Sequence, residues 1–288
     1  MRGSDSFAAK YGRWAVIVGA SEGIGAAYAE EIAACGLNLV LVARRADKLR
    51  ARAEDITSRF AVACRTLCAD VGTDAGVDRI LEEAKSVDAG LLVYNAAFAP
   101  AAPFLDLPRA DHLQVITVNS RNMLSVVHAE AGRMVTRGRG GIIIMCSMAG
   151  FQGLPGIATY AASKAFNIAI SEALYVELKP QRVDVLGCVA GATSTPGFAS
   201  TMRPVKPVPA SAGGVAPNGD GGSLDSSDGF PFWVMAPRGV ARAGLRALGR
   251  APLVVTGGVN RFAAFFFRHF FSRRSVVRFM GKASGPID

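Results

Sequence analysis

Short apolar runs alternate along the chain with longer segments in which apolar residues recur every three or four positions. Apolar runs without polar alternation are typical of strands buried on both faces of a parallel sheet, and the longer segments are typical of amphipathic helices. We expect strands at residues 14–19, 38–43, 63–67, 90–94, 141–146, 183–189 and 252–256. Because helical segments separate these runs, the pattern predicts an α/β fold with a doubly wound, Rossmann-like parallel sheet of about seven strands and helices on both faces.

Two segments depart from this alternation. Residues 203–229 are rich in Pro, Gly, Ser and Ala, and they have too few large apolar side chains to order alone. Residues 261–282 are dense in Phe and Arg. We therefore predict one domain over residues 1–260, with a flexible insertion at about 203–229, and a basic aromatic C-terminal tail over residues 261–288. The insertion could be a lid that orders on substrate binding or simply slack chain.

The composition narrows the function classes. Half of the 288 residues are hydrophobic, which is enough for one large core. The net charge of +9 is compatible with nucleic acid, a membrane surface or an anionic cofactor, but much of the excess lies in the tail. No nucleic-acid-reading module accompanies the basic residues, so no nucleic-acid partner is expected.

The cysteines and the apolar runs indicate in which cellular compartment the protein resides. Five cysteines form no disulfide pattern, and Cys64 and Cys68 lack a second Cys/His pair, so we expect free thiols and no metal site. The chain shows neither a signal-peptide pattern nor a run of transmembrane length. We expect a cytoplasmic protein, with the tail as the part that could associate with a membrane.

A glycine-rich turn follows the first predicted strand. It reads Gly19-Ala-Ser21-Glu-Gly23-Ile24-Gly25 and opens an apolar helix. Glycines at these places let the backbone approach a pyrophosphate, and the free amides of the helix start attract its charge. The turn therefore predicts a dinucleotide-binding site.

Arg44 stands at the end of the second predicted strand, where enzymes selective for NAD usually place an acid that holds the ribose 2′-hydroxyl. A guanidinium instead matches a 2′-phosphate bidentately. We therefore predict NADP(H) as the cofactor. The alternative is that Arg44 and Arg45 are an ordinary solvated basic pair at the start of a helix.

Tyr160 and Lys164 lie four residues apart in a predicted helix, hence on one face. A free Tyr has a pKa of about 10, and a cation one turn away lowers it toward the working range of an acid–base catalyst. Ser147 follows the fifth predicted strand and could hydrogen-bond the same substrate oxygen. Taken alone, such a Tyr/Lys pair is more often a surface pair.

Taken together, these motifs resemble the short-chain dehydrogenase/reductase family. The matching positions run from about residue 14 to 195 and comprise Gly19, Gly23, Gly25, Asp70-Val71, Asn95-Ala96-Ala97, Asn119, Ser147, Tyr160, Lys164 and Gly191-Ala-Thr193. Within the family, the run 7–14, residues 39–44 with Arg44, and residues 191–196 look similar to the branch that contains 17β-hydroxysteroid dehydrogenases and very-long-chain 3-oxoacyl-CoA reductases.

The resemblance implies a role for each catalytic residue. Tyr160 would transfer the proton and Ser147 would polarise the carbonyl. Lys164 would bind the nicotinamide ribose and tune Tyr160, and Asn119 would hold a water in a relay to Lys164.

The resemblance also implies the cofactor contacts and an assembly. Asp70 would contact the adenine and Asn95 would position the cofactor. The full set of expected cofactor-binding residues is Gly19, Ser21, Gly23, Ile24, Gly25, Arg44, Asp70, Val71, Asn95, Ala96, Tyr160, Lys164, Gly191 and Thr193. A homodimer or homotetramer is the expected assembly.

Three motifs depart from the family pattern. Val18 replaces a frequent Thr before the first glycine, the usual Asn-Asn-Ala-Gly reads Tyr94-Asn95-Ala96-Ala97, and Ala190 replaces a Pro. Each puts a cofactor contact or a loop geometry in question, whereas the group Asn119, Ser147, Tyr160 and Lys164 is complete.

Apolar residues that follow the fifth and sixth predicted strands favour a lipophilic substrate over a sugar. The candidates are Met148, Phe151, Leu154, Phe198, Met202, Phe230, Phe232, Trp233 and Met235. Any one of these side chains could instead pack its loop against the sheet.

The tail has two interpretations that the sequence leaves open. If residues 261–282 formed one helix, Phe262, Phe265, Phe266, Phe270, Val277 and Met280 would share a face. That face could bind an anionic membrane or pack on protein.

The sequence as a whole predicts an NADP(H)-dependent oxidoreductase that transfers a hydride between nicotinamide and a carbonyl or alcohol carbon of an apolar substrate, such as a ketone, a ketosteroid or a 3-oxoacyl compound. The alternative is a catalytically idle dinucleotide-binding scaffold or sensor at a membrane.

Overall fold

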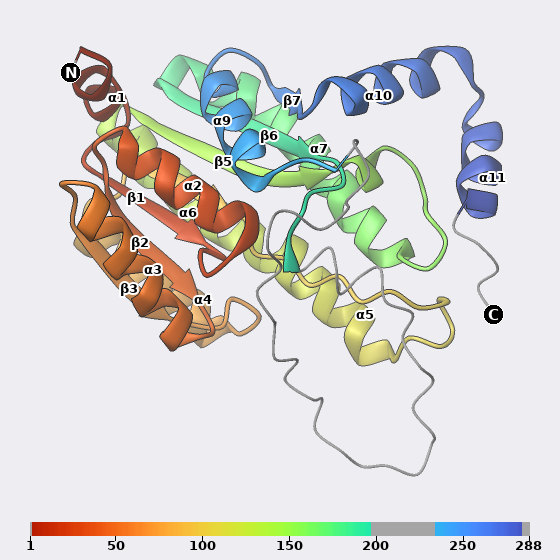
Figure 1. Ribbon diagram of the computed structural model, residues 1–288, viewed down its shortest axis with the longest axis horizontal. Helices are drawn as coiled ribbons and strands as arrows, with labels where there is room; N and C mark the ends of the chain where they lie inside the picture. The colour runs from red at the N-terminus through yellow and green to blue at the C-terminus, as the bar shows by residue number, and fades with distance from the viewer. Residues whose placement is uncertain (1, 197–233, 284–288) are drawn as a thin grey trace, which may run out of the picture.

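The computed structural model of the protein describes residues 2–196 and 234–283 (Figure 1). Seven strands in these residues form one sheet in the order β3-β2-β1-β4-β5-β6-β7, and every neighbouring pair is parallel. They are β1 (Trp14–Val18), β2 (Asn38–Ala43), β3 (Cys64–Cys68), β4 (Leu91–Tyr94), β5 (Gly140–Ser147), β6 (Val183–Ala190) and β7 (Leu253–Val255). The predicted doubly wound sheet is confirmed, and the predicted ends of its strands differ from the observed ends by at most one residue.

Helices cover both faces of the sheet (Figure 1). They are α1 (Arg2–Tyr11), α2 (Gly23–Ala34), α3 (Ala46–Arg59), α4 (Asp74–Ser86), α5 (Arg109–Ile116), α6 (Asn122–Arg137), α7 (Ala158–Glu177), α9 (Pro237–Ala247), α10 (Gly258–Phe270) and α11 (Arg273–Ala283). Because successive strand residues point to opposite faces, Val16 joins the core under α4, α6 and α7, whereas Ile17 joins the core under α2, α3 and α9.

The helical periodicity that Pro108 opens predicts one long helix to about Met134, but the structure has three segments there. A π-helical turn, Thr117–Arg121, separates α5 from α6, and α6 continues to Arg137, where Gly138 adopts a left-handed conformation with φ of 73°. A π turn adds one residue to a helical turn, and the apolar periodicity of the sequence does not reveal it. Glycine at the first position beyond a helix ends it without strain.

The C-terminal region also differs from its prediction. Helix α10 begins at Gly258, so the predicted boundary between residues 260 and 261 falls inside a helix. A break at Phe271 and Ser272 then separates α10 from α11, so residues 261–282 do not form the single helix on which a shared face through Val277 and Met280 would depend. The predicted insertion at 203–229 lies outside the described residues. None of the described helices is both long and apolar enough to span a bilayer.

Candidate active site

The predicted site residues gather at one edge of the sheet. Because all strands are parallel, their carboxyl ends lie on the same side. The side chains or loops that follow them belong to Gly19 after β1, Arg44 after β2, Asp70 after β3, Asn95 after β4, Ser147 at the end of β5 and Gly191 after β6. The strand order reverses between β1 and β4, where such folds open a crevice. There the Asn95 amide donates a hydrogen bond of 2.9 Å to the carbonyl of Gly19, which ties the two strand ends together.

The glycine turn leaves too little room for side chains at its glycine positions. A Cβ on Gly19, which has φ of 89°, would lie 2.7 Å from the Ala96 nitrogen, and one on Gly25 would lie 1.9 Å from the Gly19 oxygen. Gly23 has φ of 60° and faces Thr195, whose Cγ2 would be 3.0 Å from an added Cβ. No side chain caps the start of α2. Exposed amides at a helix start beside a close-packed glycine backbone fit a dinucleotide pyrophosphate.

Ser21 and Ile24, the other residues predicted to bind the cofactor in this turn, are half-buried within it.

A basic cluster surrounds the end of β2. Arg45 and Lys48 pair with Glu22 of the glycine turn, with nitrogens 2.7 and 3.2 Å from its Oε2. Partial burial would raise the pKa of Glu22, but these hydrogen bonds and charges lower it, so the carboxylate is ionised and compensated. Arg44 is exposed and forms no ion pair with another residue of the described part of the chain. Glu22 is not among the predicted site residues. An acidic residue inside a phosphate-binding turn is the signal that could have revealed its role in the site.

The turn after β3 is held by its own polar groups. The Asp70 carboxylate accepts a hydrogen bond of 2.8 Å from the Gly72 amide. Val71 is buried, and its carbonyl accepts a hydrogen bond of 2.6 Å from the Asn122 amide. This fixes the turn at the edge where the adenine contact is predicted.

Ser147, Tyr160 and Lys164 lie together beside the end of β5. Lys164 is buried, and its Nζ lies 5.6 Å from the centre of the Tyr160 ring and donates a hydrogen bond of 2.9 Å to the carbonyl of Met145. Ser147 accepts a hydrogen bond of 3.2 Å from the Ala149 amide and also hydrogen-bonds Tyr160. The structure therefore brings together the hydroxyl, the phenol and the amine that the sequence pattern singled out.

The electrostatics of this group differ from the prediction. Burial raises the pKa of Tyr160, and the hydrogen bond with Ser147 offsets this only in part. Burial also lowers the pKa of Lys164 to about 8. The expected lowering of the Tyr160 pKa by Lys164 is therefore wrong: burial of the phenol dominates, and the Lys164 ammonium donates to the Met145 carbonyl.

Asn119 lies in the π-helical turn and is fully buried. Its side chain accepts a hydrogen bond of 2.8 Å from the Phe98 amide and donates to the Phe98 carbonyl at 2.9 Å and to Ser163 Oγ at 3.1 Å. Ser163 in turn donates to the carbonyl of Tyr160 at 2.7 Å. Asn119 thus holds the loop after β4 against the catalytic helix, and its predicted water relay to Lys164 stays a prediction.

Gly191 and Thr193 lie in the loop after β6, close to the glycine turn. Thr193 is buried, donates to the Gly191 carbonyl at 3.0 Å and forms a parallel bridge with Met235. Met235 packs on the core below α2 and donates from its backbone to Ala192 at 2.9 Å. Of the predicted substrate-lining residues, Met235 therefore anchors this loop, whereas Phe198, Met202, Phe230, Phe232 and Trp233 lie outside the described residues.

The three departures from the family pattern are accommodated. Val18 is buried in the core. Ala97 is exposed, and only Asp88 and Arg182 among the described non-glycine residues have positive φ, so its backbone needs no glycine. Ala190 continues β6 to pair with Ser147, a position whose amide a proline would lack.

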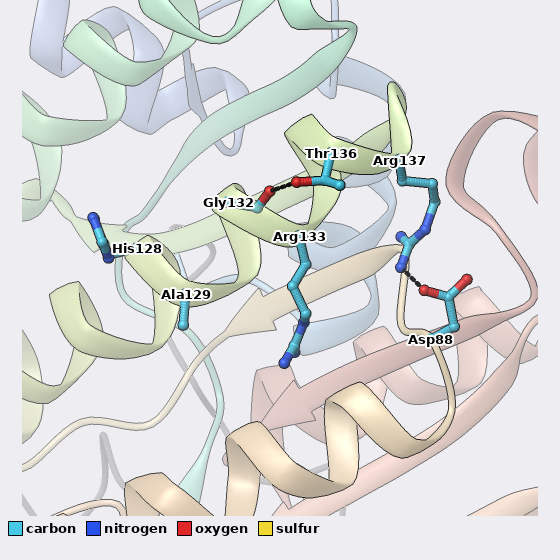
Figure 2. A pocket seen from close by; sticks show the side chains of 7 residues that line it. All are labelled: Asp88, His128, Ala129, Gly132, Arg133, Thr136 and Arg137. Atoms are coloured by element: carbon cyan, nitrogen blue, oxygen red, sulfur yellow. Dashed lines mark hydrogen bonds and ion pairs between the residues drawn. The ribbon is translucent and has the colours of Figure 1, made fainter.

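A hollow on the surface of the described residues lies along α6, away from the carboxyl ends of the strands. It has a volume of about 580 Å³ and is open to solvent (Figure 2). Its lining comes from the C-terminal half of α6 and from Asp88, and includes His128, Arg133 and Arg137. Arg137 reaches across it to pair with Asp88. None of the predicted site residues lines this hollow.

The fold and the site define a Rossmann-fold oxidoreductase. A profile of the short chain dehydrogenase family matches residues 13–205. The chain belongs to this family.

The relatives agree with this assignment. The chain is 30% identical over 256 residues to a 7β-hydroxysteroid dehydrogenase of Clostridium sardiniense, covering 89% of this chain and 90% of the relative. It is 38% identical over 190 residues to a very-long-chain 3-oxoacyl-CoA reductase of Meyerozyma guilliermondii, covering 62% of this chain and 56% of the reductase. The predicted resemblance to that branch is thereby confirmed.

Solved structures agree as well. A structure of a 7β-hydroxysteroid dehydrogenase superimposes with a TM-score of 0.82 at 26% identity, covering 95% of this chain and 98% of the other. A short-chain dehydrogenase of Sphingobium yanoikuyae in complex with NADPH superimposes with a TM-score of 0.71 at 27% identity, covering 92% and 95%.

Proposed function

We propose that the protein uses NADP(H) to interconvert a carbonyl and an alcohol on an apolar substrate. The observation that carries the proposal is the group of half-buried Ser147 and Tyr160 with buried Lys164, which lies at the same sheet edge as the glycine cradle. A scaffold that only bound a dinucleotide would not need a buried lysine beneath a tyrosine, because burial makes its charge costly.

The residues divide the reaction between them. The nicotinamide supplies or accepts the hydride. In the reductive direction Tyr160 gives its proton to the carbonyl oxygen, and Ser147 donates a hydrogen bond to the same oxygen. The ammonium of Lys164 stabilises the phenolate that remains, more strongly than it would in water because the site is buried.

Arg44 supports the choice of NADP(H) over NAD(H). Since Arg45 and Lys48 are paired with Glu22, Arg44 is the cation near the end of β2 that is left for a 2′-phosphate. A relative of similar fold binds NADPH in its crystal.

An apolar substrate is supported by the segments beside the catalytic helix. Phe104 is 59% exposed and Leu105 is 91% exposed. His112 ties their loop to the start of α7 through Thr159, at 2.6 Å, and through the Phe104 carbonyl, at 2.9 Å. The relatives are named for hydroxysteroids and 3-oxoacyl thioesters, so ketosteroids and 3-oxoacyl compounds are the first substrates to test.

The cofactor choice is tested by fluorescence titration of wild type and Arg44→Ala with NADPH and with NADH. We expect wild type to prefer NADPH, and Arg44→Ala to lose about tenfold or more of NADPH affinity with little change for NADH, because a bidentate charged pair is removed. Arg50→Ala, on the exposed side of α3, is the matched control and should bind like wild type. Equal affinities for the two cofactors in wild type would contradict the proposal.

Turnover is tested with the same proteins on a panel of ketosteroids and 3-oxoacyl thioesters. Reduction that disappears in Tyr160→Phe supports the proposed chemistry. Cofactor binding without turnover of any panel member would instead favour the idle module.

A further inference from the structure

Helices α10 and α11, residues 258–283, form an arm that leaves the sheet beside β7 (Figure 1). The first turn of α10 is anchored to the domain. The Asn260 amide donates to the Thr256 carbonyl at 2.9 Å, and it lies so close to Gly191 that a Cβ there would be 2.2 Å from it. From this anchor α10 runs away from the sheet, and at its far end the chain bends sharply into α11 (Figure 1).

The arm presents a continuous aromatic surface. Phe262, Phe265 and Phe270 are 66%, 55% and 66% exposed. The helical spacing puts Phe262 and Phe265 on the side of α10 roughly opposite Asn260, with Phe270 farther round the helix. Phe266 links them, with ring centres 5.7 Å from Phe262 and 5.3 Å from Phe270. Large exposed apolar patches of this kind mark surfaces that bind a protein, a ligand or a membrane.

The charges of the arm are all of one sign. Residues 258–283 contain six Lys and Arg residues and no Asp or Glu. The exposed ones include Arg261 on α10 and Arg273, Arg274 and Arg278 on α11. A partner must therefore accept aromatic side chains and supply negative charge. A second copy of the arm would instead repel the first.

We propose that the arm binds the surface of a bilayer that contains anionic phospholipids. The Phe side chains insert at the boundary between headgroups and acyl chains, and the Arg side chains pair with the phosphates. The arm lies along the surface and does not span it, because the 13 residues of α10 extend about 20 Å, well short of the hydrocarbon core.

The position of the arm has a consequence for the site. The arm starts after the carboxyl end of β7, at the edge that carries Ser147 and Gly191. Docking would hold the catalytic edge near the membrane, where an apolar substrate dissolves. This consequence rests on the proposed function, whereas the docking itself does not.

Co-sedimentation of the full chain with vesicles tests the proposal. We expect binding to phosphatidylcholine vesicles that contain phosphatidylglycerol, weak binding to pure phosphatidylcholine, and loss of binding at high salt. The variant Phe262→Ser/Phe265→Ser/Phe270→Ser should lower the partition coefficient about tenfold or more. Arg273→Glu/Arg274→Glu should lower it to a similar extent on anionic vesicles only.

Matched controls separate the arm from general surface effects. Val176→Ser removes an exposed apolar side chain of α7, and Arg50→Glu/Arg246→Glu reverses two exposed charges elsewhere. Both should bind vesicles within about twofold of wild type. Thermal unfolding of every variant verifies the fold without reference to the cofactor or substrate.

Three outcomes would overturn the proposal. They are no binding of wild type to anionic vesicles, equal binding by the arm variants, and a wild-type oligomer that ignores vesicles but dissociates in the Phe variant. The last would make the aromatic surface an interface between copies of the chain.

Discussion

At the scale of single residues, Lys164 shows a conflict between burial and function. The proposed catalytic role needs an ammonium beside Tyr160, but the buried position disfavours charge and lowers the pKa of Lys164 from 10.5 to about 8. A charged buried lysine costs stability that the chain must recover elsewhere. The sequence identified this residue by its spacing, whereas its cost depends on burial that only the fold reveals.

The cost predicts how Lys164→Met changes stability with pH. Between pH 8 and 10.5 the unfolded chain binds more protons at this lysine than the folded one, so its contribution to wild-type stability rises with pH across that window. Below pH 8 the buried charge of Lys164 lowers the free energy of unfolding by about 3 kcal/mol. The hydrogen bond from Lys164 to the Met145 carbonyl offsets about 1 kcal/mol of this loss. Lys164→Met should therefore be more stable than wild type by about 2 kcal/mol at pH 7.

Urea unfolding at several pH values measures this difference. The gap between Lys164→Met and wild type should close toward pH 10.5, while Lys85→Met, at an exposed position of α4, shows no such trend. A Lys164→Met variant that is less stable than wild type at pH 7 would show that the buried ammonium is well solvated by its surroundings.

At the scale of elements, the π-helical turn decides where Asn119 lies. The family resemblance found Asn119 in the sequence, but the periodicity predicted an unbroken helix and gave no sign of the turn. One hydrogen bond stabilises this turn: the buried Tyr94 hydroxyl donates to the Val118 carbonyl, within the turn, at 2.7 Å. Tyr94 replaces the first Asn of the usual family pattern, so a departure in sequence carries a structural bond.

Tyr94→Phe tests that support. The variant leaves a buried carbonyl of the turn without this donor, and it should lower the free energy of unfolding by about 1–2 kcal/mol. Because Asn119 is adjacent, turnover should fall more than cofactor affinity does. Chemical unfolding and steady-state kinetics measure the two effects. Tyr175→Phe on α7, whose hydroxyl forms no hydrogen bond within the described residues, is the control and should change neither.

At the scale of the whole molecule, the sequence predicts what is periodic or local and misses what is long-range. The seven strands were found because buried parallel strands are uniformly apolar, and the site edge followed because parallel strands end together. The pairing of Glu22 with Arg45 and the chain from Asn119 through Ser163 to Tyr160 were not found. Each joins residues from different elements, and no spacing in the sequence encodes such a contact.

Asp184 is also held by partners from other elements, and its charge links the N-terminal helix to the sheet. It is buried at the start of β6, where it accepts a hydrogen bond of 2.9 Å from Tyr11 of α1 and pairs with Lys10 and Lys179. Burial alone would raise the pKa of Asp184, but these partners lower it below its ordinary value of 3.8. The carboxylate therefore contributes stability that is present above pH 3.8 and is lost as the pH falls through the lower folded pKa.

The free energy of unfolding of Asp184→Asn should be about 1–3 kcal/mol lower than that of wild type at pH 7, and the two values should converge in acid. Asp78→Asn, at an exposed position of α4, should match wild type throughout. A constant gap from pH 7 to pH 3 would mean that Asp184 acts through packing, and that its charge does not hold the N-terminal helix to the sheet.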